Sequence, residues 1–97
     1  MGVGGAASEN CSVYMGRKFF VRYLLAVLFK LSVLGCREVK VEAIGRNIHR
    51  AVMVAESVKE ITGRLRIKSV VIGSVMMVSR SARSVRKSKI SIVLERV

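Results

Sequence analysis

The feature that most limits what this chain can fold into is the apolar run FFVRYLLAVLFKLSVL over residues 19–34. As a helix it spans about 24 Å, short of the roughly 30 Å hydrocarbon core of a bilayer. Arg22 and Lys30 lie within about 80° of each other around that helix, which predicts a narrow polar stripe and a very wide apolar face. We expect burial on most sides, by the chain's own sheet and a partner subunit, and an end at Gly35. An interfacial membrane helix is the alternative for this segment.

The neighbouring segments have strand patterns. Residues 12–15 form a short β-type run, and residues 37–43 alternate apolar and charged side chains as a half-buried strand does. The expected inner side of the second strand consists of Val39, Val41 and Ala43. The last strand alternates in the same way, with Ile90, Ile92 and Leu94 on one side.

Between these strands, residues 46–62 have helical spacing and two apolar stripes. The first stripe consists of Ile48, Ala51, Val52 and Ala55. The second consists of Val54, Val58 and Ile61. Two stripes predict one face on the sheet and another on a second surface. Residues 64–78 are rich in β-branched side chains and predict a strand, whereas the Ser- and Arg-rich residues 79–87 predict a loop.

The element order is therefore β-α-β-α-β-β, which predicts an α/β (α+β) two-layer sandwich. A mixed four-stranded sheet would carry two helices on one face and end in a long C-terminal β-hairpin arm. Residues 1–11, MGVGGAASENC, are largely Gly- and Ala-rich and predict a disordered tail. Residues 12–97 would form a single domain.

Charge indicates the class of partner. Eighteen Lys and Arg oppose six acidic residues, a formal net charge of +12. Such an excess attracts polyanions, so nucleic acid or an anionic membrane surface is the expected partner. The charge is clustered, because no basic residue precedes Arg17 and residues 80–89 contain five.

Catalytic and metal-binding patterns are missing from the sequence. His49 is the single histidine, the chain has no Asp, and no glycine-rich phosphate loop occurs. Glu38 and Glu42 would lie about 13 Å apart on a strand, too far for paired acid–base work. We expect no enzymatic activity, metal or cofactor. Cys11 and Cys36 are expected to be reduced, in a cytoplasmic setting, and Cys36 to be a small core residue; a disulfide stays open.

Both helices begin with basic side chains, a placement that the helix dipole disfavours unless an anion binds there. For Arg50, phosphate contact and a solvated position stay equally open. The predicted hairpin tip is small-residued and cationic, which suits entry into a minor groove, although a solvated tip is the alternative. The candidate nucleic-acid-binding residues are Arg17, Lys18, Arg22, Arg46, Asn47, Arg50, Arg80, Arg83, Arg86 and Lys87.

Three segments resemble the Alba family of archaeal chromatin proteins. Residues 13–26, VYMGRKFFVRYLLA, are similar to the family's hydrophobic-IG-K-K-P-V-M-N-Y-V-L-A opening. Residues 38–52, EVKVEAIGRNIHRAV, resemble its E-V-x-I-K-A-R-G-R-x-I-x-K-A-V segment, and residues 88–96 its last strand. The resemblance covers nearly everything after residue 12, in the same order. It departs from the family at Phe19, which replaces a proline, and at Ile44, which replaces a basic residue.

The resemblance implies a homodimer that binds double-stranded DNA, and also RNA, without strong sequence preference. Its two arms would reach along DNA while the body sits on the phosphates. By position, Arg17 and Lys18 match the family's lysine pair, and Arg46 matches the arginine of its G-R motif. Location on the chromosome or nucleoid is implied, with higher assembly on DNA left open. A structural RNA-binding subunit of an RNase P-like ribonucleoprotein is the alternative, and a peripheral membrane protein is a further one.

Overall fold

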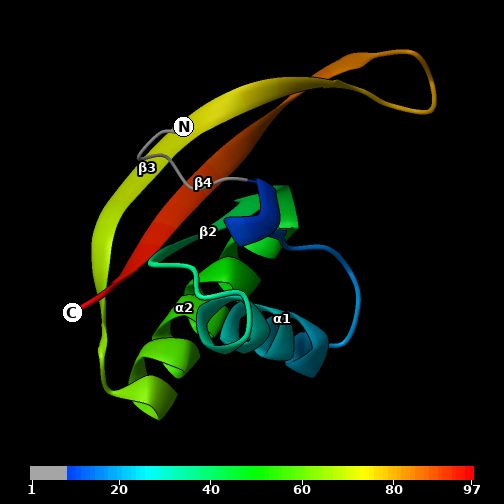
Figure 1. Ribbon diagram of the computed structural model, residues 1–97. Helices are drawn as coiled ribbons and strands as arrows, with labels where there is room; N and C mark the ends of the chain where they lie inside the picture. Colours follow the sequence, from blue (N-terminus) through cyan, green and yellow to red (C-terminus); the bar gives the residue numbers. More distant parts are fainter. Residues whose placement is uncertain (1–8) are drawn as a thin grey trace.

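The computed structural model describes residues 9–97, which fold into one sheet with two helices packed on one of its faces (Figure 1). The predicted element order is confirmed. The elements are η1 (Glu9–Cys11), β1 (Ser12–Tyr14), α1 (Phe20–Ser32), β2 (Glu38–Ile44), η2 (Gly45–Asn47), α2 (Ile48–Thr62), β3 (Leu65–Val78) and β4 (Ser84–Arg96). Of the tail predicted over residues 1–11, residues 1–8 lie outside the described part, and Glu9–Cys11 form a 3-10 turn.

The sheet is mixed, with strand order β1-β2-β4-β3. β1 runs parallel to β2, with Val13 beside Val41, and α1 is the crossover between them. β4 lies between β2 and β3 and is antiparallel to both. This topology places the central strands β2 and β4 under the helices, where their alternating patterns require burial.

The core forms where the inner sides of β2 and β4 meet the helices. Val39, Val41 and Ala43 are fully buried, and Ile90, Ile92 and Leu94 are buried opposite them, as the alternation predicts. The prediction of two separate stripes on α2 is wrong. A single inner face contains Ala51, Val54, Ala55 and Val58, whereas Val52 and Ile61 are exposed. Residues of both predicted stripes thus pack on one side of the helix.

Helix α1 is less buried than its composition predicts. Val27 and Leu31 are buried, but Val21, Leu25 and Phe29 form an exposed apolar row at four-residue spacing. The chain's own sheet and the neighbouring helix α2 cover only the inner side of α1, so burial of the outer row would need the partner subunit that the prediction included. Within residues 9–97, no helix is both long and apolar enough to cross a bilayer.

β3 and β4 form an arm that extends past the helices (Figure 1). The strand structure continues closer to the tip of the arm than predicted. The predicted loop over 79–87 is too long, since only residues 79–83 connect the strands. Arg86 and Lys87 belong to β4, opposite Met76 and Val75. The first residues of β4 lack apolar periodicity, but pairing with β3 provides hydrogen-bond partners for their backbone N–H and C=O groups. They are therefore strand residues despite their Ser- and Arg-rich sequence.

The two cysteines form a disulfide, so the expectation of reduced thiols is wrong for this structure. Cys11 ends η1 just before β1, and Cys36 lies between α1 and β2. Because β1 and β2 are parallel neighbours, both strands begin at the same end of the sheet. The bond therefore links the start of β1 to the start of β2 across the crossover helix. Cys36 is buried, as predicted.

Candidate nucleic-acid interface

A basic hollow lies where β2 ends and gathers side chains from three distant parts of the sequence. It has a volume of about 570 Å³ and is lined by Arg17, Ile44, Arg46, Asn47 and Lys87. Four of these five belong to the predicted nucleic-acid-binding set. The segment after β1 contributes the first, η2 the next pair of polar residues, and β4 the last. We call this set of five residues the basic hollow.

The loop between β1 and α1 is fixed by Arg50 of α2. Its guanidinium donates hydrogen bonds to the backbone carbonyls of Gly16 and Lys18 and lies over the ring of Tyr23, 5.4 Å from its centroid. The Tyr23 hydroxyl in turn accepts a hydrogen bond from the Lys18 backbone N–H, at 3.0 Å. Arg50 is therefore a positioning residue that presents Arg17 and Lys18.

Two glycines shape the site, and each directly precedes a candidate arginine. A Cβ on Gly16 would come within 2.9 Å of the Tyr23 hydroxyl, so only glycine leaves that oxygen in place. Gly45 has φ +61°, a left-handed conformation that other residues adopt at a cost. The Lys87 stem passes 3.6 Å from where a Gly45 Cβ would stand, which brings the arm's base against η2.

Gly16, Tyr23 and Gly45 are not among the residues predicted for the site. The dipeptide Gly-Arg occurs at residues 16–17 and 45–46, but it also occurs at 63–64, outside the basic hollow, so it does not single out the two glycines. Nothing in the sequence pairs Tyr23 with Arg50, which is 27 positions further along the chain.

Both helix starts lack a side-chain cap. Phe19 before α1 and Asn47 before α2 make no capping hydrogen bond, and the first turn of neither helix contains an acidic residue. N-terminal backbone N–H groups and basic side chains therefore occur together without a compensating negative charge, an arrangement that favours an anion. Arg22 lies exposed in the first turn of α1.

The structure separates the remaining candidates from the basic hollow. Lys18 lies next to it along the loop, while Arg80 and Arg83 belong to the turn of the arm and Arg86 to the end of β4 near that turn. All of these cations are exposed, and no ion pair within residues 9–97 involves any of them.

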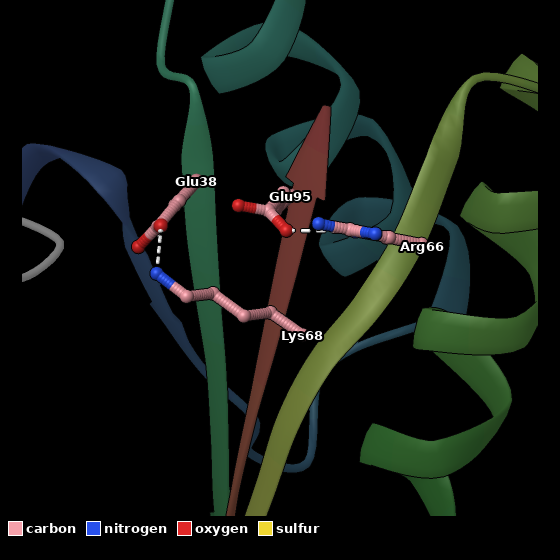
Figure 2. A network of polar contacts seen from close by, with 4 residues as sticks. All are labelled: Glu38, Arg66, Lys68 and Glu95. Atoms are coloured by element: carbon pink, nitrogen blue, oxygen red, sulfur yellow. Dashed lines mark hydrogen bonds and ion pairs between the residues drawn. The ribbon is translucent and has the colours of Figure 1, made fainter. Parts of the chain in front are cut away.

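The sheet face away from the helices has the opposite character, and its charges are paired. Lys68 binds Glu38 at 2.5 Å, and Arg66 binds Glu95 at 2.8 Å (Figure 2). We call this surface the paired face; its third carboxylate is Glu42, which contacts both Lys40 and Lys89.

Hydrogen bonding and neighbouring charge determine the protonation of Glu42. Partial burial would raise the pKa of this carboxyl, but a hydrogen bond from Ser91 and the Lys40 and Lys89 ammonium groups outweigh it and hold the pKa below its ordinary value. The hydrogen bond to Glu38 raises the pKa of Lys68. Both shifts favour the charged forms of these two groups, Glu42 and Lys68.

Comparisons with known proteins agree on one family. No protein-family model matches the chain. The DNA/RNA-binding protein Alba of Methanococcus maripaludis is 35% identical over 83 residues, 84% of this chain and 93% of that protein.

Solved structures give the same result for the fold. Alba from Thermoplasma volcanium superposes with a TM-score of 0.82 at 23% identity, over 88% of this chain and 99% of that one. ALBA1 from Trypanosoma brucei gives 0.71 at 24% identity, over 93% and 72%. With a relative of this identity matched over most of its length, and with the same two-layer fold, the chain belongs to the Alba family.

Proposed function

We propose that this protein binds double-stranded DNA, and RNA duplexes as well, without strong sequence preference and as a homodimer. The observation that supports this function best is the basic hollow, which unites Arg17, Arg46, Asn47 and Lys87 beside an uncapped helix start. The relative from Methanococcus maripaludis is described as DNA/RNA-binding, which is consistent with the proposal. Coating and compaction of a chromosome is the role that such binding would serve.

The proposed contact is with phosphates rather than base edges. Arg17 and Arg46 offer planar guanidinium donors for phosphate oxygens, and Asn47 and Lys87 add further polar groups to the same hollow. Contacts to the backbone fix the position of a protein on a duplex and carry no sequence information directly. The cations of the arm would extend the footprint along the duplex.

Exposed apolar side chains favour a homodimer. Ile72 on β3 is 76% exposed and Val70 beside it is exposed as well, on the sheet face that the helices cover elsewhere. A chain of 97 residues buries only part of its apolar surface alone, and a second copy would cover this row.

A salt titration tests the function. If each dimer neutralises about 6–10 phosphates, the affinity for duplex DNA falls about 10³–10⁵-fold between 50 and 200 mM salt. Fluorescence anisotropy with duplexes of different sequence measures this, and sedimentation gives the stoichiometry. Binding that does not depend on salt, or that strongly selects one sequence, contradicts the proposal.

Competition between duplex DNA and structured RNA tests the alternative role as a ribonucleoprotein subunit. A preference for folded RNA would favour that role.

Attachment to an anionic membrane surface is a second candidate, favoured by the exposed row Val21, Leu25 and Phe29 on α1. An amphipathic helix with apolar side chains and nearby cations such as Arg22 can lie in a lipid interface. Co-sedimentation with anionic vesicles separates the candidates. Partition onto vesicles without binding to duplex DNA supports membrane attachment and contradicts the proposed function.

A further inference from the structure

The tip of the arm carries exposed apolar side chains that neither the core nor phosphate binding uses. Met76 is 63% exposed and Val78 is 74% exposed. Both residues lie at the end of β3 next to the turn, in the part of the arm that extends beyond the helices (Figure 1). An exposed apolar pair at the end of a two-stranded ribbon favours a partner that covers it.

Strand register places these two side chains on one face, together with a cation. Met76 is opposite Arg86, and Val78 is opposite Ser84. Directly opposite residues point to the same side of a sheet, and residues two apart in a strand share that side. The face at the tip therefore consists of an apolar pair beside a guanidinium, and the turn adds Arg80 and Arg83.

This apolar pair is distinct from the row proposed for the subunit contact. Along β3, Ser74 separates Ile72 from Met76, and it faces Ser88 across the strands. Two small hydroxyl side chains thus interrupt the apolar face. Residues 73–90 contain no acidic residue, so a second copy of the arm would bring like charges together at the tip.

We infer that Met76 and Val78 form an apolar wedge that enters the minor groove of duplex DNA and partly unstacks one base step. The inference rests on the proposed function, because Arg80, Arg83 and Arg86 must first hold the tip against the phosphates. Apolar side chains inserted from the minor groove kink a duplex towards the major groove and open the minor groove for the protein. The cations of the tip would contact the phosphates along the rims of the groove, and the apolar pair would contact the sugars and bases within it.

The chemistry also indicates which sequences bend most easily. Pyrimidine–purine steps such as TA unstack at the lowest cost, so the wedge is expected to settle there without hydrogen-bonded recognition. An A-form RNA duplex presents a wide, shallow minor groove, where a wedge has no narrow groove to open. The kink is therefore expected on DNA and not on duplex RNA of the same length.

The test measures bending and unstacking separately from binding. A DNA duplex of about 30 bp carries a dye at each end, and a second one carries 2-aminopurine at a central TA step. The wild-type protein should shorten the end-to-end distance as a bend of about 20–90° does, and raise 2-aminopurine fluorescence. Met76→Thr with Val78→Thr should lose at least half of both signals, with less than a tenfold loss of affinity and an unchanged salt slope.

The matched control is Met77→Thr with Val85→Thr, which changes an opposed apolar pair on the other face of the same arm. Both signals should persist in this variant. Binding without bending by the wild type overturns the wedge and leaves the proposed function standing, whereas no binding overturns both. Unchanged bending in the Met76/Val78 variant also overturns the wedge. So does conversion of that variant from dimer to monomer, which would assign the pair to the subunit contact.

Discussion

Lys87 and Lys89 are two residues apart on the same side of β4, yet their surroundings differ. Lys89 contacts the Glu42 carboxylate at 3.5 Å, on the paired face. Lys87 lies beyond the end of β2, which stops at Ile44, and lines the basic hollow instead. β2, which supplies Glu38 and Glu42 to the paired face, ends at Ile44, opposite Lys89. The basic hollow lies just beyond that end.

Net charge alone does not locate a binding surface on this molecule. The paired face has four cations in ion pairs, namely Lys40, Arg66, Lys68 and Lys89. Around the basic hollow, Arg17, Arg46 and Lys87 have no ion pair within the described part of the chain. A polyanion has to displace a carboxylate at the first surface and only water at the second.

Reversal of charge beside the basic hollow should weaken nucleic-acid binding more than any other change discussed below. Arg17→Glu with Lys18→Glu should weaken binding of all duplex sequences by about 10²–10³-fold at 100 mM salt, because both cations are unpaired and the proposed dimer would present them twice. The salt slope should fall by about 4, one for each lost phosphate contact. Anisotropy titrations at several salt concentrations measure both quantities.

The matched control makes the same change of charge on the paired face. Arg66→Glu with Lys68→Glu should cost less than tenfold in affinity, and thermal unfolding checks that the fold survives. Equal losses in the two variants would contradict the distinction between the surfaces and leave only a general effect of net charge.

A smaller effect is expected at Arg50, which positions the loop rather than binding. Arg50→Lys keeps the charge, but an ammonium cannot bridge the Gly16 and Lys18 carbonyls while lying over Tyr23. Affinity should fall about tenfold, with a salt slope unchanged, since the number of phosphate contacts stays the same. If lysine restores wild-type affinity, Arg50 acts as a phosphate ligand instead.

Much of the fold could be predicted because its signals are local. Alternation along β2 and β4 follows from burial on one side, so Val41 and Ile92 could be placed in the core from the sequence. The start of β4 could not, because Arg86 and Lys87 are strand residues only through pairing with β3. Pairing is a non-local contact, and a Ser- and Arg-rich segment gives no sign of it.

The site was predictable residue by residue but not as an arrangement. Spacing and charge single out Arg17, Arg46 and Lys87, yet their meeting depends on where β2 ends and on Gly45 adopting a positive φ. The Cys11–Cys36 disulfide could not be predicted from the sequence either, because it depends on the parallel register of β1 and β2, which is a non-local contact. The role of Arg50 in positioning the loop after β1 could not be predicted either, because only the packing of α2 brings its guanidinium to the Gly16 and Lys18 carbonyls.

The ion pairs of the paired face should make a small, pH-dependent contribution to stability. The pKa of Glu42 is lowered on folding from an ordinary value of 4.5, so its contribution to stability is present above that value and is lost as the pH falls through the folded pKa. Glu42→Gln should therefore lower the free energy of unfolding by about 1 kcal/mol at pH 7 and by much less at pH 3. Urea unfolding at the two pH values measures this, with the exposed Glu60→Gln as control.

The same variant also changes the balance of charge between the paired face and the basic hollow. Without the carboxylate, Lys89 and Lys40 lose their ion-pair partner, and Lys89 becomes an unpaired cation two residues from Lys87. If pairing is what separates the paired face from the basic hollow, Glu42→Gln should raise the affinity for duplex DNA about twofold to fivefold while it lowers stability. An affinity that falls with stability would mean that Glu42 supports the hollow through the sheet, and that the boundary between the surfaces is not set by charge pairing.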